Sequence, residues 1–156
     1  MKSSSKGGFT LIELLLVAAI LLALVSVSMP RFISSFKGLE TDNLALNLVQ
    51  LMRYAHTRAV ADGVEYKVRI DKGISKYWLE KRDRSGGDNG FKAFKSKNTF
   101  PRRIPSGALV EIEGDGVAFY PDGSSQGAQF VISYGKAERY ELYVAEATSD
   151  VRMDKK

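Results

Sequence analysis

The sequence predicts an α+β fold in which a long N-terminal helix packs on a mainly antiparallel β-sheet domain. Three observations predict it. Residues 9–29 are apolar apart from one charged side chain, and the run is long enough for a helix that crosses a membrane. Residues 30–62 keep apolar side chains at helical spacing. Residues 63–156 change to a period of two, broken by turn-forming residues, as in a series of short strands.

Residues 9–29 are expected to form a transmembrane helix. At a rise of about 1.5 Å per residue the run reaches roughly 32 Å, and a hydrocarbon core is about 30 Å thick. No small-x-small cleavage site follows the run, so we expect it to be retained and not removed as a secretory signal. The leader, residues 1–8, carries Lys2 and Lys6. A positive leader stays in the cytoplasm, which places the rest of the chain across the membrane.

Residues 30–62 are expected to continue this helix as an amphipathic segment. Its apolar positions are Leu44, Leu48, Leu51, Ala55 and Ala59. Spacings of three and four residues keep these side chains on one face. Pro30 is expected to bend the helix because proline removes a backbone donor, and Gly38 is the second expected bend. Gly63 can adopt the left-handed conformation that ends a helix.

Residues 63–156 are expected to form a β-rich globular domain. Residues 64–70 alternate apolar and charged side chains, which indicates a half-buried strand, and residues 76–81 return as its hairpin partner. Residues 82–98 are rich in Gly, Lys, Asp and Ser, so we expect an exposed loop. Four further strands are expected at residues 108–113, 116–120, 128–133 and 139–145, and residues 150–156 are either a strand or a frayed tail.

The composition argues against several classes of function. The chain has no cysteine and one histidine, His56, so it lacks the residues of a usual nucleophilic triad or zinc site. We expect no catalytic residue, metal or cofactor, and a membrane-tethered enzyme is the least favoured class. The net charge is +5, and Lys2 and Lys6 of the leader supply two of these charges. The remaining excess is too small to indicate nucleic-acid binding.

The segment 82–103 leaves three alternatives open: it binds calcium, it binds DNA or an acidic partner, or it binds nothing. Asp83, Asp88 and Asn89 offer oxygen ligands in a glycine-rich stretch, but the lysines and arginines around them oppose a divalent cation. Aromatic rings interleaved with basic residues can stack on single-stranded bases. The rings here are Phe91, Phe94 and Phe100. We favour rings packed on the sheet and lysines left in water.

Glu13 is the one charged residue of the apolar run. A carboxylate at the centre of a membrane-spanning helix costs roughly 2.5–3.5 kcal/mol on insertion scales. One interpretation is that Glu13 reaches the cytoplasmic headgroups. The other is an ion pair within an assembly, with the α-amino group released by cutting between Gly8 and Phe9 as a candidate partner. Intramembrane carboxylates usually mark function, which favours the second interpretation.

The stretch KGGFTLIELLLVAAILLALVSVSMPRF resembles the N-terminus of the type IV pilin and type II secretion pseudopilin superfamily. The resemblance rests on a basic leader ending in Gly8, on Phe9 and Glu13 at the family's spacing, and on the proline after the apolar run. It implies a pilin-like fold, cleavage between Gly8 and Phe9 by a prepilin peptidase, and N-methylation of Phe9. It also implies that Glu13 pairs with the N-terminus of a neighbouring subunit.

Two further stretches resemble the GspH/FimT-like minor pseudopilins and minor pilins. One is LMRYAHTRAVADGVEYKVRI, and the other is the strand–turn–strand pattern of Phe119, Pro121, Gly123 and Ser125. The resemblance implies a minor pseudopilin of a type II secretion system, at or near the pseudopilus tip. The alternative is a FimT-like minor pilin that acts in pilus initiation or DNA uptake. The tail TSDVRM lacks the basic motif of DNA-binding members, so nucleic acid is not an expected partner.

The resemblance also implies partners and a location. The partners are other major and minor pseudopilins, the prepilin peptidase/N-methyltransferase and the inner-membrane secretion platform. The location is the cell inner membrane, crossed once, with residues 63–156 in the periplasm, followed by incorporation into the pseudopilus.

Processing of the N-terminus gives the first testable prediction. In a host that has a prepilin peptidase, the membrane-extracted protein should lack residues 1–8 and carry one additional methyl group. Intact mass spectrometry measures both changes at once. Retention of the leader in such a host would show that the cleavage expected between Gly8 and Phe9 does not occur.

Overall fold

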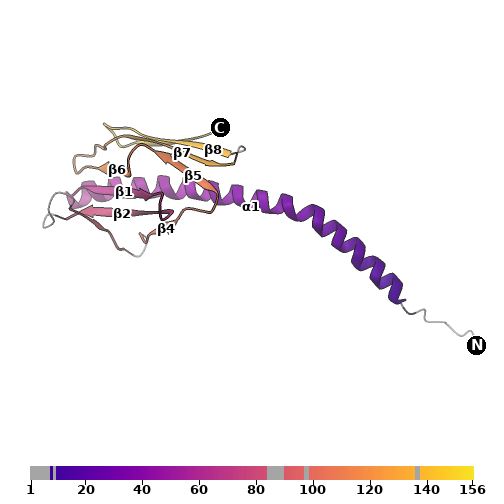
Figure 1. Cartoon of the computed structure of the whole chain (residues 1–156). Helices are drawn as coiled ribbons and strands as arrows, with labels where there is room; N and C mark the ends of the chain where they lie inside the picture. Colours follow the sequence, from indigo (N-terminus) through magenta and orange to yellow (C-terminus); the bar gives the residue numbers. More distant parts are fainter. Residues whose placement is uncertain (1–7, 9, 84–89, 97–98, 136–137) are drawn as a thin grey trace, which may run out of the picture. The chain divides into compact units, whose positions relative to one another are not determined.

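The computed structural model describes residue 8 and residues 10–83, 90–96, 99–135 and 138–156 (Figure 1). Two compact units are present, of which one ends at Lys37 and the other runs from Gly38 to Lys156. The elements are α1 (Leu11–Asp62), β1 (Tyr66–Asp71), β2 (Lys76–Arg82), β3 (Phe91–Ala93), β4 (Arg102–Arg103), β5 (Ala108–Ile112), β6 (Gly116–Phe119), β7 (Ala128–Tyr134), β8 (Glu138–Val144) and β9 (Val151–Lys155).

The first unit consists of the N-terminal part of α1, which is helical from Leu11 onward. Among the described residues, no helix combines the length and the apolar character that crossing a membrane requires. The transmembrane segment expected at residues 9–29 therefore stays a prediction. Pro30 lies within α1, and the bends expected at Pro30 and Gly38 also stay predictions.

The second unit begins with the amphipathic part of α1. The apolar face predicted from the sequence is confirmed: Leu44, Leu48, Leu51, Ala55 and Ala59 are all at most 8% exposed. The helix ends where the sequence predicts. Gly63 has a φ of 62°, and the Val64 amide donates to the Ala59 carbonyl at 3.3 Å. This is the Schellman pattern of hydrogen bonds, which turns the chain sharply into β1.

The first sheet, sheet A, has the strand order β3-β2-β1-β6, with β4 also paired to β2. The β1–β2 hairpin is confirmed, with Ile70 opposite Tyr77 across an antiparallel pair. The expectation of a structureless loop over residues 82–98 is wrong in part, because β3 pairs with β2 inside that range. The three residues Phe91–Ala93 follow a glycine-rich stretch and carry too little strand signal on their own, so the pairing comes from the exposed edge of β2.

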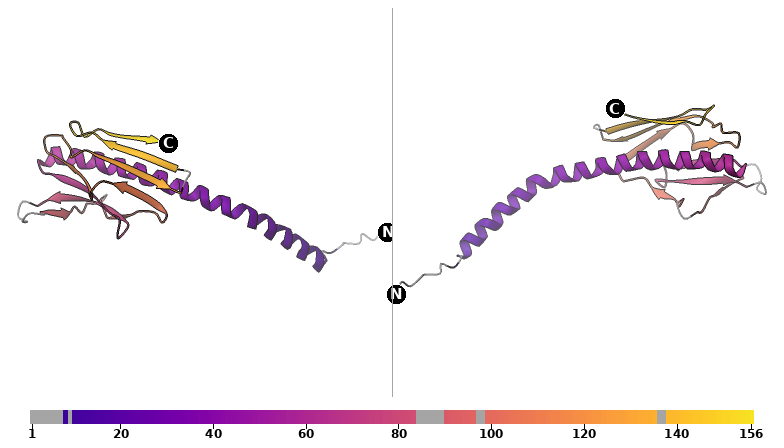
Figure 2. Two further views of the ribbon diagram at one scale, coloured as in Figure 1. Left: turned by 45° about the horizontal axis from the view of Figure 1, so that its top comes forward. Right: turned by 180° about the vertical axis from the view of Figure 1, so that it is seen from behind.

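The second sheet, sheet B, has the order β5-β7-β8-β9, and all its pairs are antiparallel. The C-terminal residues form β9 and are not a frayed tail, because Val151 and Met153 pair with β8 at Val144 and Leu142. The β-rich domain is therefore two antiparallel sheets, which cover different sides of the C-terminal part of α1 (Figure 2).

The core of the second unit joins all three layers. Leu48 and Met52 of α1 are fully buried, as are Tyr66 of sheet A and Phe130 of sheet B. Full burial of a large apolar side chain contributes roughly 1.5–3 kcal/mol, so this shared cluster is the main source of stability. Neither sheet could bury its inner face without the helix.

Gly116 is a position where the fold requires glycine. It opens β6 opposite Arg69 of β1, with a φ of 155°. A Cβ atom there would lie 2.0 Å from the backbone carbonyl oxygen of Val68. Because the obstacle is backbone within a sheet, no side-chain movement can relieve the overlap.

We expect Gly116→Ala to destabilise the fragment 38–156 by roughly 1–3 kcal/mol more than Gly114→Ala does. Gly114 also has a positive φ, 81°, but a Cβ there would meet nothing within 4 Å, so that variant isolates the backbone strain. Urea unfolding followed by circular dichroism measures the difference. Equal destabilisation by the two variants would contradict the packing argument.

Candidate assembly site

The N-terminal end of α1 is built around Thr10. The Thr10 carbonyl accepts from the amides of Glu13 (3.1 Å) and Leu14 (3.2 Å), and its hydroxyl accepts from the Glu13 amide (3.3 Å). Thr10 is therefore the N-cap, and Glu13 is the third residue of the helix. Thr-x-x-Glu is the order of a capping box, and a negative charge in the first turn favours the helix dipole.

This local role of Glu13 was not anticipated from the sequence, although the Thr-x-x-Glu spacing before an apolar run could have revealed it. It supplies a reason for a glutamate at this position that needs no second subunit. The capping arrangement does not, however, place a cation beside the Glu13 carboxylate. Within the described residues the Glu13 carboxylate has no ion pair, and Phe9, whose amine is the expected partner, lies outside them.

The helix around Glu13 presents apolar side chains to its surroundings on every side. Their exposed fractions run from 46% at Val17 to 81% at Leu11. The set comprises Leu11, Ile12, Leu14, Leu15, Leu16, Val17, Ile20, Leu21, Leu22, Leu24 and Val25. An exposed apolar surface of this extent marks a site of contact with lipid or with other apolar surfaces.

In the second unit, the turn after β6 ties the two sheets together. Phe119 is fully buried, and Ser125 forms an isolated bridge with it. The Ser125 amide donates to the Glu146 carbonyl (2.7 Å) and its hydroxyl to the Ala145 carbonyl (3.0 Å). The Ser149 hydroxyl donates to the Gly123 carbonyl (2.9 Å). The turn is thus held to the chain between β8 and β9 by side chains as well as backbone.

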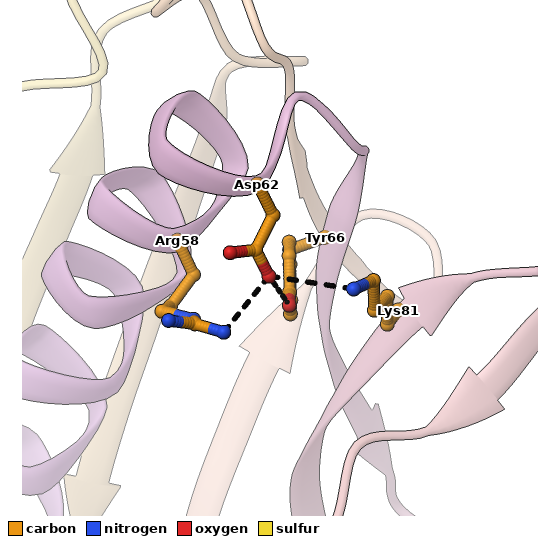
Figure 3. Close-up of polar contacts among 4 residues, drawn as sticks. All are labelled: Arg58, Asp62, Tyr66 and Lys81. Atoms are coloured by element: carbon orange, nitrogen blue, oxygen red, sulfur yellow. Dashed lines mark hydrogen bonds and ion pairs between the residues drawn. The ribbon is translucent and has the colours of Figure 1, made fainter.

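A polar cluster joins the end of α1 to sheet A (Figure 3). Asp62 Oδ2 accepts from the Tyr66 hydroxyl (2.5 Å), Arg58 Nη2 (2.9 Å) and Lys81 Nζ (3.3 Å). These donors lower the pKa of Asp62, and the hydrogen bond from the Tyr66 hydroxyl is the largest cause. Partial burial acts in the opposite direction and raises the pKa. Burial is the main cause that raises the pKa of Tyr66. We assign the cluster a structural role, since Asp62 bonds to each of the other three side chains; among the described residues the buried Arg58 Nε has no hydrogen-bond partner.

Comparison with known proteins gives two kinds of match. A profile of the prokaryotic N-terminal methylation motif matches residues 3–29. The fold is similar to that of the minor pseudopilin EpsH from the Type 2 Secretion System of Vibrio cholerae, with a TM-score of 0.63 and 16% identity over 74% of this chain and 96% of that chain. Among curated proteins, no sequence relative matches.

The fold is also similar to that of the type IV minor pilin FimU from Pseudomonas aeruginosa. That match has a TM-score of 0.58 and 12% identity over 76% of this chain and 90% of that chain. The chain therefore carries a prokaryotic N-terminal methylation motif and has a pilin-like fold. In this pilin-like chain the span matched by the motif includes Gly8, Phe9 and Glu13, whose processing and assembly roles stay predictions.

Other residues singled out in the sequence have structural surroundings in the pilin-like fold. His56 lies at the edge of the core, with its ring centroid 6.5 Å from that of Phe119. Trp78 is half-buried on the outer face of sheet A, where its indole N–H donates to Glu80 (2.8 Å).

The aromatic residues of segment 82–103 lie in different surroundings, two packed against other side chains and one exposed. Phe94 packs edge-on against Tyr66, at 5.3 Å between ring centroids, and Phe91 is half-buried beside Lys67. Phe100, in contrast, is 62% exposed, so the prediction that all three rings pack on the sheet is wrong for Phe100. Pro101 follows it, and Arg102 and Arg103 then form β4, which pairs with β2 at the rim of sheet A.

The calcium alternative concerned Asp83, Asp88 and Asn89. Asp83 pairs with Lys92, and the other two residues lie outside the described part of the chain. Within that part, no three acidic or histidine side chains are placed to hold a metal ion.

The Asp62 cluster predicts a pH-dependent stability. An unfolded aspartate titrates near pH 3.9. Because the folded pKa of Asp62 is lower, its stabilisation is complete above that pH and is lost as the pH falls through the folded pKa. At pH 7, Asp62→Asn should therefore lower the free energy of unfolding by roughly 1.5–3 kcal/mol.

The difference between wild type and Asp62→Asn should shrink as the pH is lowered below about 4. Urea unfolding of fragment 38–156 between pH 2.5 and 7 measures it. Glu111→Gln, which neutralises an exposed carboxylate on β5, is the matched control and should change little. A constant difference across the whole pH range would contradict the ionised-carboxylate account.

Proposed function

We propose that this pilin-like chain is a minor pseudopilin of a type II secretion system. It would be a structural subunit at or near the tip of the periplasmic pseudopilus, helping to initiate assembly and to push secreted proteins outward. One observation carries the proposal. The chain combines the N-terminal methylation motif with a globular fold similar to nearly the whole of the EpsH structure.

The proposed mechanism begins in the inner membrane. Residues 9–29 hold the precursor there, with the leader in the cytoplasm and the β-rich unit in the periplasm. A prepilin peptidase cuts between Gly8 and Phe9, and methylation of the Phe9 amine follows. Cleavage creates a positive charge close to Glu13, where the helix wall is apolar on every side.

The assembly step uses the charge of Glu13. In a lone subunit the carboxylate lies in apolar surroundings without a cation from the described residues. Docking against a neighbouring subunit brings the methylated amine of that subunit to the carboxylate. Two unit charges attract far more strongly in a low dielectric than in water, so the pair fixes the register of one helix on the next. The apolar side chains around Glu13 then exchange lipid for protein contacts.

The second unit has the features of a rigid structural module and not of an enzyme. Its polar clusters bond internally, and its core is shared between α1 and both sheets. We therefore propose that it needs no cofactor or metal. Its partners would be other pseudopilins, the peptidase/N-methyltransferase and the secretion platform.

The alternative is a FimT-like minor pilin of a type IV pilus, acting in pilus initiation or DNA uptake. The similarity to FimU favours it, since that match also covers most of the compared chain. The DNA-uptake form of this alternative is the weaker one. Arg152, the single arginine of the C-terminal tail, forms an ion pair with Asp150 at 3.0 Å, so a phosphate would compete with that carboxylate.

Substitution of Glu13 separates its two roles. Glu13→Val removes both the charge and the capping side chain and should abolish incorporation into filaments, while the second unit stays folded. Glu13→Gln keeps a side chain that can complete a capping box but removes the charge. If the ion pair drives assembly, both variants should fail in a pull-down of assembled filaments.

Leu16→Val, one turn further along the apolar wall, is the control and should incorporate normally. Normal incorporation of Glu13→Gln together with failure of Glu13→Val would show that Glu13 acts through helix capping, and it would contradict the ion-pair account.

Deletion of the gene tests the proposed system. Loss of protein secretion with intact pili, restored by the wild-type gene, is the expected result. Loss of pili with normal secretion would support the minor pilin alternative instead.

A further inference from the structure

A groove lies at the end of the second unit where α1 enters it. Strand β1 runs back along α1 from Gly63, so the turn that follows β1 lies at this end (Figure 1). Two adjoining hollows of about 300 and 620 Å³ lie between that turn and residues 103–111, and share Ser75, Ile104 and Ala108. We call the two hollows together the stem-side groove, and we call the part of α1 in the first unit, residues 11–37, the stem.

The stem-side groove is basic. Its walls carry Lys72, Lys76 and Arg103, against one carboxylate, Glu111. Lys76 on β2 lies directly opposite Arg103 on β4. On its other side Lys76 lies opposite Asp71 of β1, which offsets part of the like-charge repulsion. A negatively charged partner would offset the charge of Arg103.

These cations differ from most others in the second unit. Lys67, Arg82, Lys92, Arg139 and Arg152 each have a carboxylate within 4 Å. In the described part of the chain, neither Lys76 nor Arg103 has such a partner. Lys72 donates to the backbone carbonyl of Ile112 (3.2 Å), which leaves its charge uncompensated.

Exposed apolar side chains accompany the cations. Ile74, in the turn that forms one wall, is 56% exposed, and Leu109 on the opposite wall is 60% exposed. Phe100, which precedes β4 by two residues, is 62% exposed. Cations beside exposed aliphatic and aromatic groups are the composition of surfaces that lie at the headgroup level of a membrane.

The covalent connection to the expected membrane span is short. Only residues 30–37 separate residue 29 from the start of the second unit at Gly38. Eight helical residues measure about 12 Å, close to the Debye length of roughly 8–10 Å at physiological ionic strength. The second unit is therefore tethered to the expected span by a short segment of helix.

We infer that the stem-side groove binds the anionic phospholipid surface of the membrane that holds the stem, before the subunit enters a filament. This inference rests on the proposed function, because it requires the stem to be inserted. An acidic protein is the other partner that the charge would accept. The short connection and the exposed apolar side chains favour the lipid surface.

The single tryptophan, Trp78, provides a built-in reporter. It lies two residues from Lys76 on the same strand and is half-buried on the outer face of sheet A. The full chain is reconstituted into nanodiscs that contain a phospholipid with a nitroxide on its headgroup, which quenches only nearby fluorophores. One set of discs is phosphatidylcholine, and the other contains 30% phosphatidylglycerol.

We expect quenching of Trp78 to be at least twofold greater in the anionic discs, and to fall to the neutral level in 1 M salt. Each basic residue next to an anionic leaflet strengthens binding by about fivefold, so the loss of three should abolish the difference. The test variant is K72Q/K76Q/R103Q. The control, R139Q/R152Q/K156Q, removes the same charge from sheet B and should quench as the wild type does.

Each other outcome overturns the inference. Equal quenching in neutral and anionic discs would show that charge plays no part. No quenching in either, with the chain co-purifying with the discs, would show that the groove does not meet the lipid. In that case a change of Trp78 emission on addition of soluble polyglutamate would assign the groove to an acidic protein.

Two further readouts keep these outcomes distinct. Failure of the chain to co-purify with the discs would contradict the membrane anchor of the proposed function and not the groove alone. Circular dichroism of both triple variants checks folding, and a misfolded test variant is replaced by K76Q/R103Q, which leaves the Lys72 hydrogen bond in place.

Discussion

The buried face of α1 is the contact on which the second unit depends. Two sheets that share no strand are held in place because each covers a different side of this helix. Small side chains make the approach possible: Ala45, Ala55 and Ala59 are fully buried, next to the larger Leu48 and Met52. Close packing of this kind leaves little room for change of volume, since core interiors are as dense as organic crystals. The hydrogen-bonded turn at residues 119–125 also ties the end of β6 in sheet A to the chain between β8 and β9 of sheet B.

The same helix carries two different surfaces, and the difference has a plain origin in the sequence. After Gly38 most positions away from the sheets are polar, and the exposed apolar side chains of this part of α1 are Leu39, Leu46 and Val60. From Leu11 to Val25, Glu13 is the only charged residue, and the large apolar side chains are exposed. This part of the first unit therefore needs contact with lipid or with another apolar surface. The place of Glu13 in the first turn gives its charge a favourable interaction with the helix dipole even without a partner.

Much of the fold could be predicted because periodicity is a local signal. The face of α1 from Leu44 to Ala59 follows from residue spacing alone, and Gly63 ends the helix for a reason intrinsic to glycine. The strands β5 to β8 were predicted because short runs of strand-forming residues lie between strong turn residues. By contrast, β3 and β4 are two or three residues long and depend on an edge that β2 offers. No local pattern encodes an edge, so these strands were missed.

The division into two sheets was likewise beyond a local argument, because it depends on which strands pair. The Asp62 cluster shows the same limit. Asp62 and Tyr66 are neighbours in sequence, but Lys81 joins them only through the register of β1 and β2, where it lies opposite Tyr66. At the N-terminus the limit was of another kind: the Thr10–Glu13 spacing is visible in the sequence, and it places a negative charge in the first turn of a helix that Thr10 caps.

The polar ties between α1 and the sheets bear on how the unit carries mechanical load. Asn47 accepts from Arg102 (2.7 Å), Arg53 donates to the Val151 carbonyl (3.3 Å), and Asp42 bonds to Tyr140. These ties are spaced along the helix and reach both sheets. A force applied along the helix axis therefore loads them together, as shear, and does not peel them apart one after another. Traction on the stem would be spread across the whole unit, so that the module resists being stripped from its own helix.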